Sequence, residues 1–253
     1  MPTALITGAS AGLGAEFARQ IAAKHGDLVL VARRADALEE LADELRRAHG
    51  VGVEVLTADL ADENDVHRVA QRISDSANPI DLLINNAGFG LPLQFADNPI
   101  EDEVRHLRVH VEASMRLMHA ALGVMRGRGG RIINVASVAG FISRSTYSAC
   151  KSWLIGFSRW ANGEYGRDGV SVTAVCPGFT HTTFHARMGL EPGKEGIPAI
   201  MWLDAADVVR EALRDAAKGK AVSVPSLRYK IIVAVSRLLP SSLTAGVARR
   251  GRV

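Results

Sequence analysis

The chain has 253 residues, of which 47% are hydrophobic and 23% are charged, and its formal net charge at pH 7 is +3. This length and hydrophobic content suit one sizeable core, so we expect a single α/β domain. The positive charge is not gathered into a Lys/Arg-rich block with interleaved aromatic residues. This composition argues against a protein that binds nucleic acid.

The two cysteines, Cys150 and Cys176, belong to no CxxC pair or disulfide framework, which fits a reducing compartment. No basic region precedes an apolar stretch near the N-terminus, so we expect no signal peptide. No apolar run reaches the roughly 18 residues that a membrane span needs. We therefore expect a cytoplasmic protein without a transmembrane segment.

A glycine-rich turn stands between the first predicted strand and the first predicted helix. The apolar run Thr3–Thr7 leads into this turn, and residues 15–24 then have helical apolar spacing. The turn contains Gly8, Gly12 and Gly14. Such glycines let backbone N–H groups approach a pyrophosphate, and the helix N-terminus adds partial positive charge. The unit predicts nucleotide binding, and the alternative is an ordinary flexible loop.

The second predicted strand, residues 28–32, is continuously apolar, as expected in a parallel sheet that is covered on both faces. It ends in Arg33 and Arg34. An acidic residue at this strand end would bind the adenosine ribose hydroxyls, whereas arginine suits a 2′-phosphate. The pair therefore predicts NADP(H); the alternative is that two surface arginines simply begin the next helix.

Strands and helices alternate through the rest of the chain. We predict strands over residues 53–57, 81–84, 131–136, 170–175 and 221–224. We predict helices over residues 36–48, 63–76, 101–125, 147–165 and 204–218. This alternation indicates a Rossmann-like, doubly wound parallel β-sheet with helices on both faces, in a single domain over residues 1–225.

Tyr147 and Lys151 are four residues apart on a predicted helix, so their side chains share one face. A phenol normally titrates near pH ~10, and a neighbouring ammonium favours the phenolate and lowers its pKa. The pair is therefore a candidate proton donor or acceptor near pH 7. The alternative is an exposed tyrosine beside a solvated lysine.

Several of these motifs together resemble the short-chain dehydrogenase/reductase family in order and spacing, from Thr3 to about Val224. The motifs are TGASAGLG, Asp59, NNAG, Ser137, the Tyr147/Lys151 pair and PGFTHT. The resemblance implies that Tyr147 is the general acid that protonates a carbonyl oxygen. It implies that Lys151 binds the nicotinamide ribose and that Ser137 polarises the carbonyl.

The resemblance also implies a cofactor site that runs along the ends of the strands. Its expected members are Gly8, Ser10, Gly12, Leu13, Gly14, Arg33, Arg34, Asp59, Leu60, Asn86, Ala87, Gly88, Tyr147, Lys151, Pro177, Gly178, Thr180 and Thr182. The alternative for Asp59 is a cap of the following helix, and the alternative for Ser137 is an inert serine at a strand end.

Two features depart from the family. Nine residues separate Ser137 from Tyr147, about three fewer than is common, so either the cleft is more open there or the loop crosses it more directly. His110 stands where the family has an asparagine that positions a water between the catalytic lysine and solvent. An imidazole could hold that water or relay a proton; the alternative is a helix histidine that points elsewhere.

Histidine spacing also raises a metal site, because His106/His110 and His181/His185 each have the four-residue spacing of zinc-binding helices. Neither pair has an obvious third ligand or an HExxH glutamate. We therefore expect no metal.

Apolar residues gather where the substrate would lie, which suits an apolar or bulky carbonyl compound better than a sugar. They are Leu91, Leu93, Phe95, Phe141, Phe184, Met188, Met201 and Trp202. The alternative is that some of them pack as core under a lid.

Residues 226–253 form a basic, amphipathic C-terminal extension. It could dock on a neighbouring subunit, cover the pocket or touch a membrane surface, and docking on protein is the outcome we expect. The family usually pairs its long helices, so we also expect a homodimer or homotetramer.

The whole pattern predicts an NADPH-dependent enzyme that reduces an apolar ketone or aldehyde, a small-molecule substrate, by hydride transfer. The alternative from another class is a non-catalytic NADP-binding sensor or scaffold, but such proteins typically lack the Tyr/Lys pair. Sugar-nucleotide epimerisation is a third alternative, although its relatives usually have TGxxGxxG where this chain has TGxxxGxG.

Overall fold

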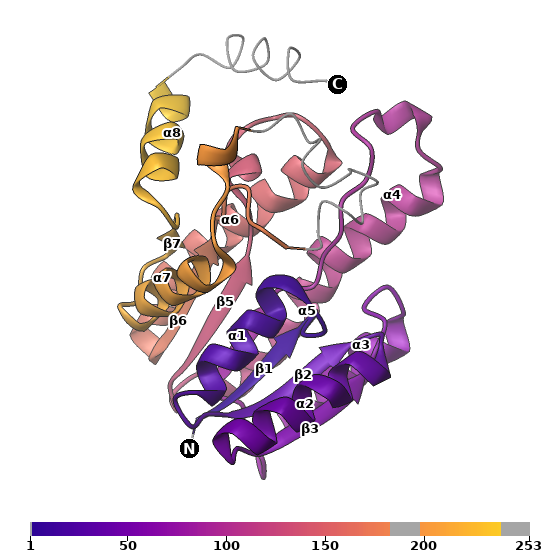
Figure 1. The fold of residues 1–253 in the computed structure, drawn as a ribbon, viewed down its shortest axis with the longest axis vertical. Coiled ribbons are helices and arrows are strands. Elements are labelled where there is room, and N and C mark those ends of the chain that lie inside the picture. Colours follow the sequence, from indigo (N-terminus) through magenta and orange to yellow (C-terminus); the bar gives the residue numbers. More distant parts are fainter. Residues whose placement is uncertain (1, 183–197, 239–253) are drawn as a thin grey trace.

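The computed structural model describes residues 2–182 and 198–238, which form a doubly wound α/β domain around one parallel sheet (Figure 1). The seven strands lie in the order β3-β2-β1-β4-β5-β6-β7. Their bounds are β1 Thr3–Thr7, β2 Asp27–Ala32, β3 Val53–Thr57, β4 Leu82–Asn85, β5 Gly130–Val135, β6 Val170–Val175 and β7 Val222–Ser223. The predicted fold class is confirmed.

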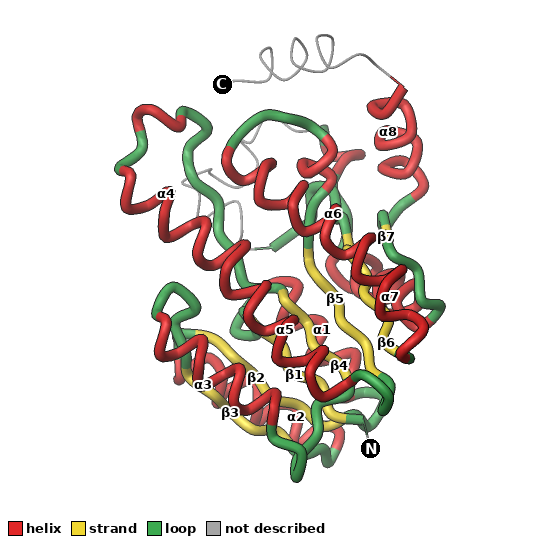
Figure 2. Tube along the Cα trace, turned by 180° about the vertical axis from the view of Figure 1, so that it is seen from behind, coloured by secondary structure: helices red, strands yellow, loops and turns green. Residues whose placement is uncertain are grey.

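Helices cover both faces of the sheet (Figures 1 and 2). One face carries α1 Gly12–Ala22, α2 Ala35–His49 and α7 Ala205–Ala217. The other carries α3 Glu63–Ser74, α5 Ser114–Met125 and α6 Thr146–Tyr165. The strands read as continuous apolar runs because their side chains alternate between these two cores. In β1, for example, Leu5 packs into one core and Ile6 into the other.

The predicted helix over residues 101–125 is interrupted in its middle. The chain forms α4 over Ile100–Leu107, a π-helical stretch over Arg108–Ala113, and then α5. A π-helical stretch carries a wider turn, which shifts the side chains that follow it around the helix axis. The sequence prediction was wrong here because an uninterrupted apolar pattern says nothing about such an insertion.

Most other predicted boundaries are within two residues of the observed ones. The first helix is an exception, because it begins at Gly12 rather than at residue 15 and so starts inside the glycine turn. The last strand, Val222–Ser223, is one residue shorter at each end than predicted.

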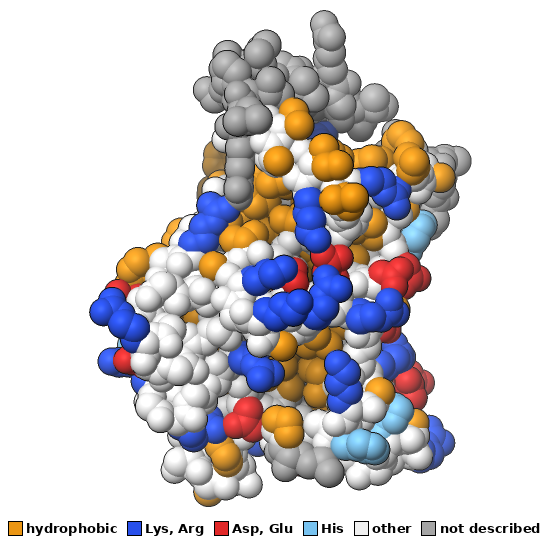
Figure 3. Space-filling model, turned by 90° about the vertical axis from the view of Figure 1, so that its left-hand side faces the viewer, with side chains coloured by type: hydrophobic (Ala, Val, Ile, Leu, Met, Phe, Trp, Pro, Cys, Tyr) orange, Lys and Arg blue, Asp and Glu red, His pale blue; other side chains and the backbone are white. Residues whose placement is uncertain are grey.

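Helix α8, Leu227–Leu238, follows the last strand and packs back on the domain. On the inner face of this helix Tyr229 and Val233 are buried, whereas Leu227, Ile231 and Val235 on its outer face are exposed. Figure 3 shows apolar side chains over α8 above a band of lysines and arginines.

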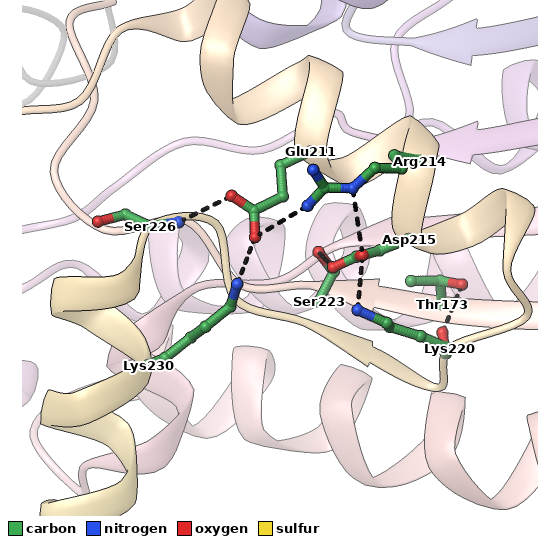
Figure 4. A network of polar contacts seen from close by, with 8 residues as sticks. All are labelled: Thr173, Glu211, Arg214, Asp215, Lys220, Ser223, Ser226 and Lys230. Carbon is green, nitrogen blue, oxygen red and sulfur yellow. Dashed lines mark hydrogen bonds and ion pairs between the residues drawn. The ribbon is translucent and has the colours of Figure 1, made fainter.

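Ion pairs hold α8 and β7 to α7 (Figure 4). Glu211 accepts a hydrogen bond from Lys230 of α8 at 2.5 Å and another from the Ser226 backbone N–H at 3.1 Å. The neighbouring Asp215 is almost fully buried and accepts hydrogen bonds from Lys220 at 2.7 Å and Ser223 at 2.8 Å. Burial alone would raise the pKa of Asp215, but these two donors outweigh it and lower the pKa.

Candidate active site

The glycine turn is shaped so that side chains cannot fill it. Gly8 and Gly12 have φ of +66° and +56°, and a Cβ on Gly14 would lie 2.3 Å from the Gly8 carbonyl oxygen. The N-terminus of α1 has no side-chain cap at Ala11 and no acidic residue in its first turn. Its N–H groups are therefore left for a ligand, which fits the pyrophosphate of a dinucleotide.

Arg33 and Arg34 are exposed at the end of β2, beside this turn. The Arg34 guanidinium donates a hydrogen bond to the Ser10 carbonyl oxygen at 3.2 Å. The structure thus brings a predicted arginine onto the predicted phosphate turn.

Asp59 lies at the end of β3 and is held by Arg105 of α4, with 2.6 Å between the carboxylate and the guanidinium. Its other oxygen accepts a hydrogen bond from the Ala61 backbone N–H at 3.0 Å. The cap of α3 is instead Asp62, which accepts from the Asp65 backbone N–H at 3.0 Å. The alternative that Asp59 caps the following helix is therefore wrong.

The NNAG stretch after β4 is fastened to the glycine turn. The Asn86 amide donates to the Thr7 carbonyl oxygen at 2.9 Å and to the Gly8 carbonyl oxygen at 3.2 Å. The Thr7 hydroxyl accepts from the backbone N–H groups of Asn86 and Ala87. Asn86 therefore holds the ends of β1 and β4 together, and Ala87 and Gly88 follow at the cleft.

Lys151 is buried on α6, and its ammonium donates a hydrogen bond to the Val135 carbonyl oxygen at 2.6 Å. Burial disfavours the charged form and lowers the pKa of Lys151 to about 8. The Lys151 nitrogen lies 5.5 Å from the centre of the Tyr147 ring. The predicted pair is therefore brought together, and the alternative of a solvated surface pair is wrong.

The pKa of Tyr147 moves opposite to the sequence-based expectation. Burial raises it to about 12, and a hydrogen bond with Ser137 opposes that rise. The expected net lowering of the Tyr147 pKa is wrong for this structure, because the loss of solvent around the phenol is the largest influence on it. The phenol consequently stays protonated at neutral pH, as a proton donor requires.

Ser137 follows β5 and begins a short 3-10 helix over Val138–Phe141, where its hydroxyl accepts from the Ala139 backbone N–H at 3.1 Å. Its hydrogen bond with Tyr147 excludes the inert alternative for this side chain. The shortened loop packs directly on α6, since a Cβ on Gly140 would lie 2.8 Å from the Lys151 backbone carbon.

His110 faces the site rather than pointing elsewhere. Its Nε2 lies 3.0 Å from the Phe89 backbone nitrogen and 2.8 Å from the Phe89 carbonyl oxygen, and the tautomer decides which is bonded. The His110 and Tyr147 rings meet edge to face, with 5.6 Å between their centres. Burial, followed by Lys151 and His106, holds the pKa of His110 well below its usual value, so the ring is neutral.

Sequence reasoning gave no catalytic role to two neighbours of His110. His106 is fully buried with its ring centre 4.2 Å from that of His110, and Glu103, one turn earlier, is 5% exposed. The available signal was the spacing 103, 106 and 110, which repeats on one face of a helix.

On the candidate substrate side, the segments 179–182 and 201–203 lie side by side and form a short stem. Thr180 pairs with Leu203, and the His181 ring stacks on Trp202 with 4.8 Å between centres. Thr182 lies against Gly12 of the phosphate turn, where an added Cβ would be 3.3 Å from it. The predicted lining residues Phe184 and Met188 and the predicted pair member His185 lie outside the described residues.

The other predicted lining residues differ in exposure. Leu91, Leu93, Phe141, Met201 and Trp202 are intermediate in burial, whereas Phe95 is 58% exposed.

Tyr229 of α8 ties this stem together, which the sequence did not indicate. Its hydroxyl accepts from the Phe179 N–H at 3.0 Å and donates to the Met201 carbonyl oxygen at 2.8 Å. Its ring lies on Gly178, where a Cβ would be 2.0 Å away, and Pro177 accepts from the Val138 N–H. Part of the C-terminal extension thus supports the loop of the site.

Within residues 2–182 and 198–238, no three His, Cys, Asp or Glu side chains are placed to hold a metal ion. In the same residues, no helix is long and apolar enough to cross a membrane.

A cavity of about 540 Å³ lies between α6, β7 and α8, and Tyr147 is not among its lining residues, which include Arg159, Val222 and Val233.

Comparisons with known proteins agree with this geometry. The family model described as short chain dehydrogenase matches residues 2–192. A 3-oxoacyl-[acyl-carrier-protein] reductase of Rattus norvegicus is 31% identical over 80% of this chain and 86% of its own. The ketoacyl reductase HetN of Nostoc sp. is 30% identical over 95% of this chain and 86% of its own.

Solved structures agree as well. A short-chain dehydrogenase of Sphingobium yanoikuyae in complex with NADPH superposes with a TM-score of 0.85, at 34% identity and covering 94% of each chain. A bulky-bulky ketone specific alcohol dehydrogenase of Comamonas testosteroni superposes at 0.81, with 31% identity over 94% of this chain and 92% of its own. The chain belongs to the short-chain dehydrogenase/reductase family of oxidoreductases.

Proposed function

We propose that this protein is an NADPH-dependent reductase that converts an apolar ketone or aldehyde to an alcohol. The observation that carries the proposal is the grouping of Ser137, Tyr147 and Lys151 at the end of β5 and the start of α6. Tyr147 is protonated and bonded to Ser137, and Lys151 is buried beside its ring. A buried lysine beside a partly buried phenol favours turnover over a scaffold role, because titratable groups with perturbed pKa values cluster at functional sites.

A nicotinamide cofactor supplies the hydride when it is bound. The chain's own residues then do the remaining work. Ser137 donates a hydrogen bond toward the carbonyl oxygen, where negative charge develops. Tyr147 delivers its proton to that oxygen, so the alkoxide leaves as an alcohol and Tyr147 is left as a phenolate. The nearby Lys151 ammonium stabilises that phenolate once it forms.

Cofactor choice rests on the end of β2. Arg33 and Arg34 are exposed there, and Arg34 already reaches Ser10 of the phosphate turn. A 2′-phosphate would give these guanidinium groups a charge-assisted, bidentate partner. The Sphingobium relative, which was solved with NADPH, supports the same choice.

The substrate class rests on the lining of the cleft. The apolar side chains Phe141, Met201 and Trp202 are partly buried in the segments that follow β5 and β6. The Comamonas relative is described as specific for bulky-bulky ketones, and the rat and Nostoc relatives as ketoacyl reductases. These relatives support an apolar ketone as the class to test first.

The test is to incubate the purified protein with NADPH and a panel of apolar ketones and aldehydes while following the absorbance of the reduced cofactor. Oxidation of NADPH that depends on a carbonyl compound, and that is lost in Tyr147→Phe, is the expected result. Tight NADPH binding without turnover of any compound would instead indicate a sensor or scaffold.

We further propose a homodimer or homotetramer in the cytoplasm. Leu107 and Met115 are 49% and 44% exposed on the long α4–α5 run, where a second copy would cover them. The thiols of Cys150 and Cys176 are buried, which suits a reducing compartment. Light scattering of the purified protein tests the assembly, because a monomer at micromolar concentration contradicts it.

A further inference from the structure

One face of the helix that carries His110 bears a row of three buried, titratable side chains. Glu103 and His106 lie on α4, and His110 lies on the π-helical stretch that follows. Their exposed fractions are 5%, 0% and 0%. π-Helical stretches are rare and are frequent at functional sites, so the interruption at this point is itself a functional signal.

The row leads from the catalytic tyrosine toward the protein surface. The ring centres of Tyr147 and His110 are 5.6 Å apart, and those of His110 and His106 are 4.2 Å apart. Glu103 follows one turn earlier, and its Oε1 accepts a hydrogen bond from the Asn98 amide at 2.7 Å. Asn98 belongs to the loop before α4, at the outer end of the row.

Each member of the row presents a buried polar atom without a protein partner among the described residues. These atoms are Glu103 Oε2, His106 Nε2 and His110 Nδ1. Buried polar atoms in native proteins are nearly always satisfied, so three exceptions on one helix face need an explanation. A purely structural row would be more stable with apolar side chains, whereas a row that exchanges protons needs such atoms.

The imidazoles are suited to passing a proton without storing charge. A neutral imidazole accepts a proton at one ring nitrogen and releases another from the second. Burial, followed by Lys151, lowers the pKa of His106 to about 4, while Glu103 acts in the opposite direction. From α6 the row also faces Tyr147 and Cys150, whose sulfur lies 3.8 Å from His106 Nδ1. Both rings are therefore neutral at pH 7.

We propose that Glu103, His106 and His110 form a proton path between solvent and the Tyr147–Lys151 pair. The inference rests on the proposed reductase function. Each reduction takes one proton from Tyr147 to the substrate oxygen, and one proton must return to the phenolate. It enters at Glu103 beside Asn98 and passes through the two imidazoles, with water bridging the spaces between them. Glu103, His106 and His110 are positioning residues, because they act through Tyr147.

The experiment compares Glu103→Gln and His106→Gln with the control His119→Gln, which changes an exposed histidine on α5. Glu103→Gln keeps an oxygen for the Asn98 amide but cannot bind a proton. We expect kcat to fall roughly 3- to 30-fold in both row variants, less than the loss of a general acid itself. The KM for NADPH should not change, and His119→Gln should match the starting protein.

The deciding measurement is the solvent isotope effect on kcat in H2O and D2O. If return of the proton becomes slow, the isotope effect should rise in both row variants, and imidazole in the buffer should restore part of the rate in His106→Gln. A lower kcat with an unchanged isotope effect would mean a structural role and would overturn the proposal. Unchanged kcat in both variants would overturn it as well.

A readout without turnover separates this inference from the proposed function. The ring-nitrogen NMR signals of His106 in the full chain should shift in Glu103→Gln, while those of His119 should not. A starting protein that reduces no carbonyl compound overturns the reductase function and the path with it. If the protein is active but Glu103→Gln changes neither the His106 signals nor the isotope effect, the proton path alone is overturned.

Discussion

The two halves of the cleft are built from different materials. The candidate cofactor side, where β1 turns into α1, is mostly backbone: it has glycines with positive φ and uncapped N–H groups at a helix start, and the Asn86 side-chain amide is bonded to backbone carbonyl oxygens. The catalytic side, where α4 and α6 face each other, is made of buried titratable side chains. The two sides therefore differ in their physical basis, since one is a turn of backbone groups and the other is a cluster of desolvated titratable groups.

The largest effect is expected on the catalytic side. Tyr147→Phe removes the proton donor and keeps the ring against His110 and Lys151. We expect kcat to fall roughly 10²–10⁴-fold, with little change in NADPH binding. Steady-state kinetics and a cofactor titration measure the two quantities.

Tyr165→Phe is the matched control, because it changes a tyrosine at the far end of the same helix, α6. Normal turnover by Tyr147→Phe would contradict the assignment of Tyr147 as the proton donor and of its side of the cleft as the catalytic side.

The cofactor side is tested by Arg33→Asp. A bidentate contact with the 2′-phosphate contributes roughly 1.5–3 kcal/mol, so the starting protein should bind NADPH about 10–100-fold more tightly than NADH. The variant should reverse that preference and leave kcat with its preferred cofactor nearly unchanged. Dissociation constants for both cofactors decide the matter.

Arg47→Asp, an exposed arginine later on α2, should leave the preference as it was. Equal affinities for NADPH and NADH in the starting protein contradict the assignment.

Desolvation on the catalytic side should cost stability, which Lys151→Met tests. Burial lowers the pKa of Lys151 to about 8, so at pH 7 the folded protein carries a charge that its interior disfavours. Removing the charge should raise the free energy of unfolding of the cofactor-free protein by roughly 1–3 kcal/mol at pH 7, although activity is lost.

The sign of the pH dependence follows from the lowered pKa. Between pH 8 and 10.5 the unfolded chain holds the Lys151 proton and the folded chain does not, so the starting protein gains stability as pH rises. The advantage of Lys151→Met should therefore fade across that window. Denaturant unfolding at both ends measures it, and a variant that is less stable at pH 7 would show that the Val135 hydrogen bond outweighs desolvation.

The smallest effect concerns His110, which touches both halves. His110→Ala should slow turnover several-fold, because the Phe89 backbone loses its partner and the proton path loses a member. His110→Asn should slow it less, because the amide keeps a partner for Phe89 but cannot relay a proton through a ring. Since burial keeps the imidazole neutral, no inflection in kcat near pH 6.5 should come from this residue. Superimposable pH profiles and rates for the three proteins would place His110 outside the mechanism.

Local sequence patterns were enough to predict the strands and the glycine turn that follows the first of them. Apolar runs gave the strands, and glycine spacing gave the turn, because backbone conformation depends on residues that are neighbours in sequence. The order and spacing of motifs gave Ser137, Tyr147 and Lys151 as members of one site.

The features that the sequence did not predict depend on tertiary packing. The π-helical stretch over Arg108–Ala113, the burial of Glu103 and the support that Tyr229 gives to Phe179 each join segments that are distant in sequence. The prediction of a lowered pKa for Tyr147 was wrong for the same reason. The four-residue spacing reveals that Lys151 is a neighbour, but it does not reveal how much solvent the phenol loses in the fold.

The contact between Gly88 and His110 means that these two positions cannot vary independently. A Cβ on Gly88 would lie 2.5 Å from His110 Cε1, so any larger residue there must displace the imidazole. In a double-mutant cycle, Gly88→Ala should therefore do more harm alone than when combined with His110→Asn, whose side chain is smaller. Substitutions at positions 88 and 110 would therefore be expected to arise as a pair. A larger residue at position 88 should be tolerated only after a smaller one has replaced His110.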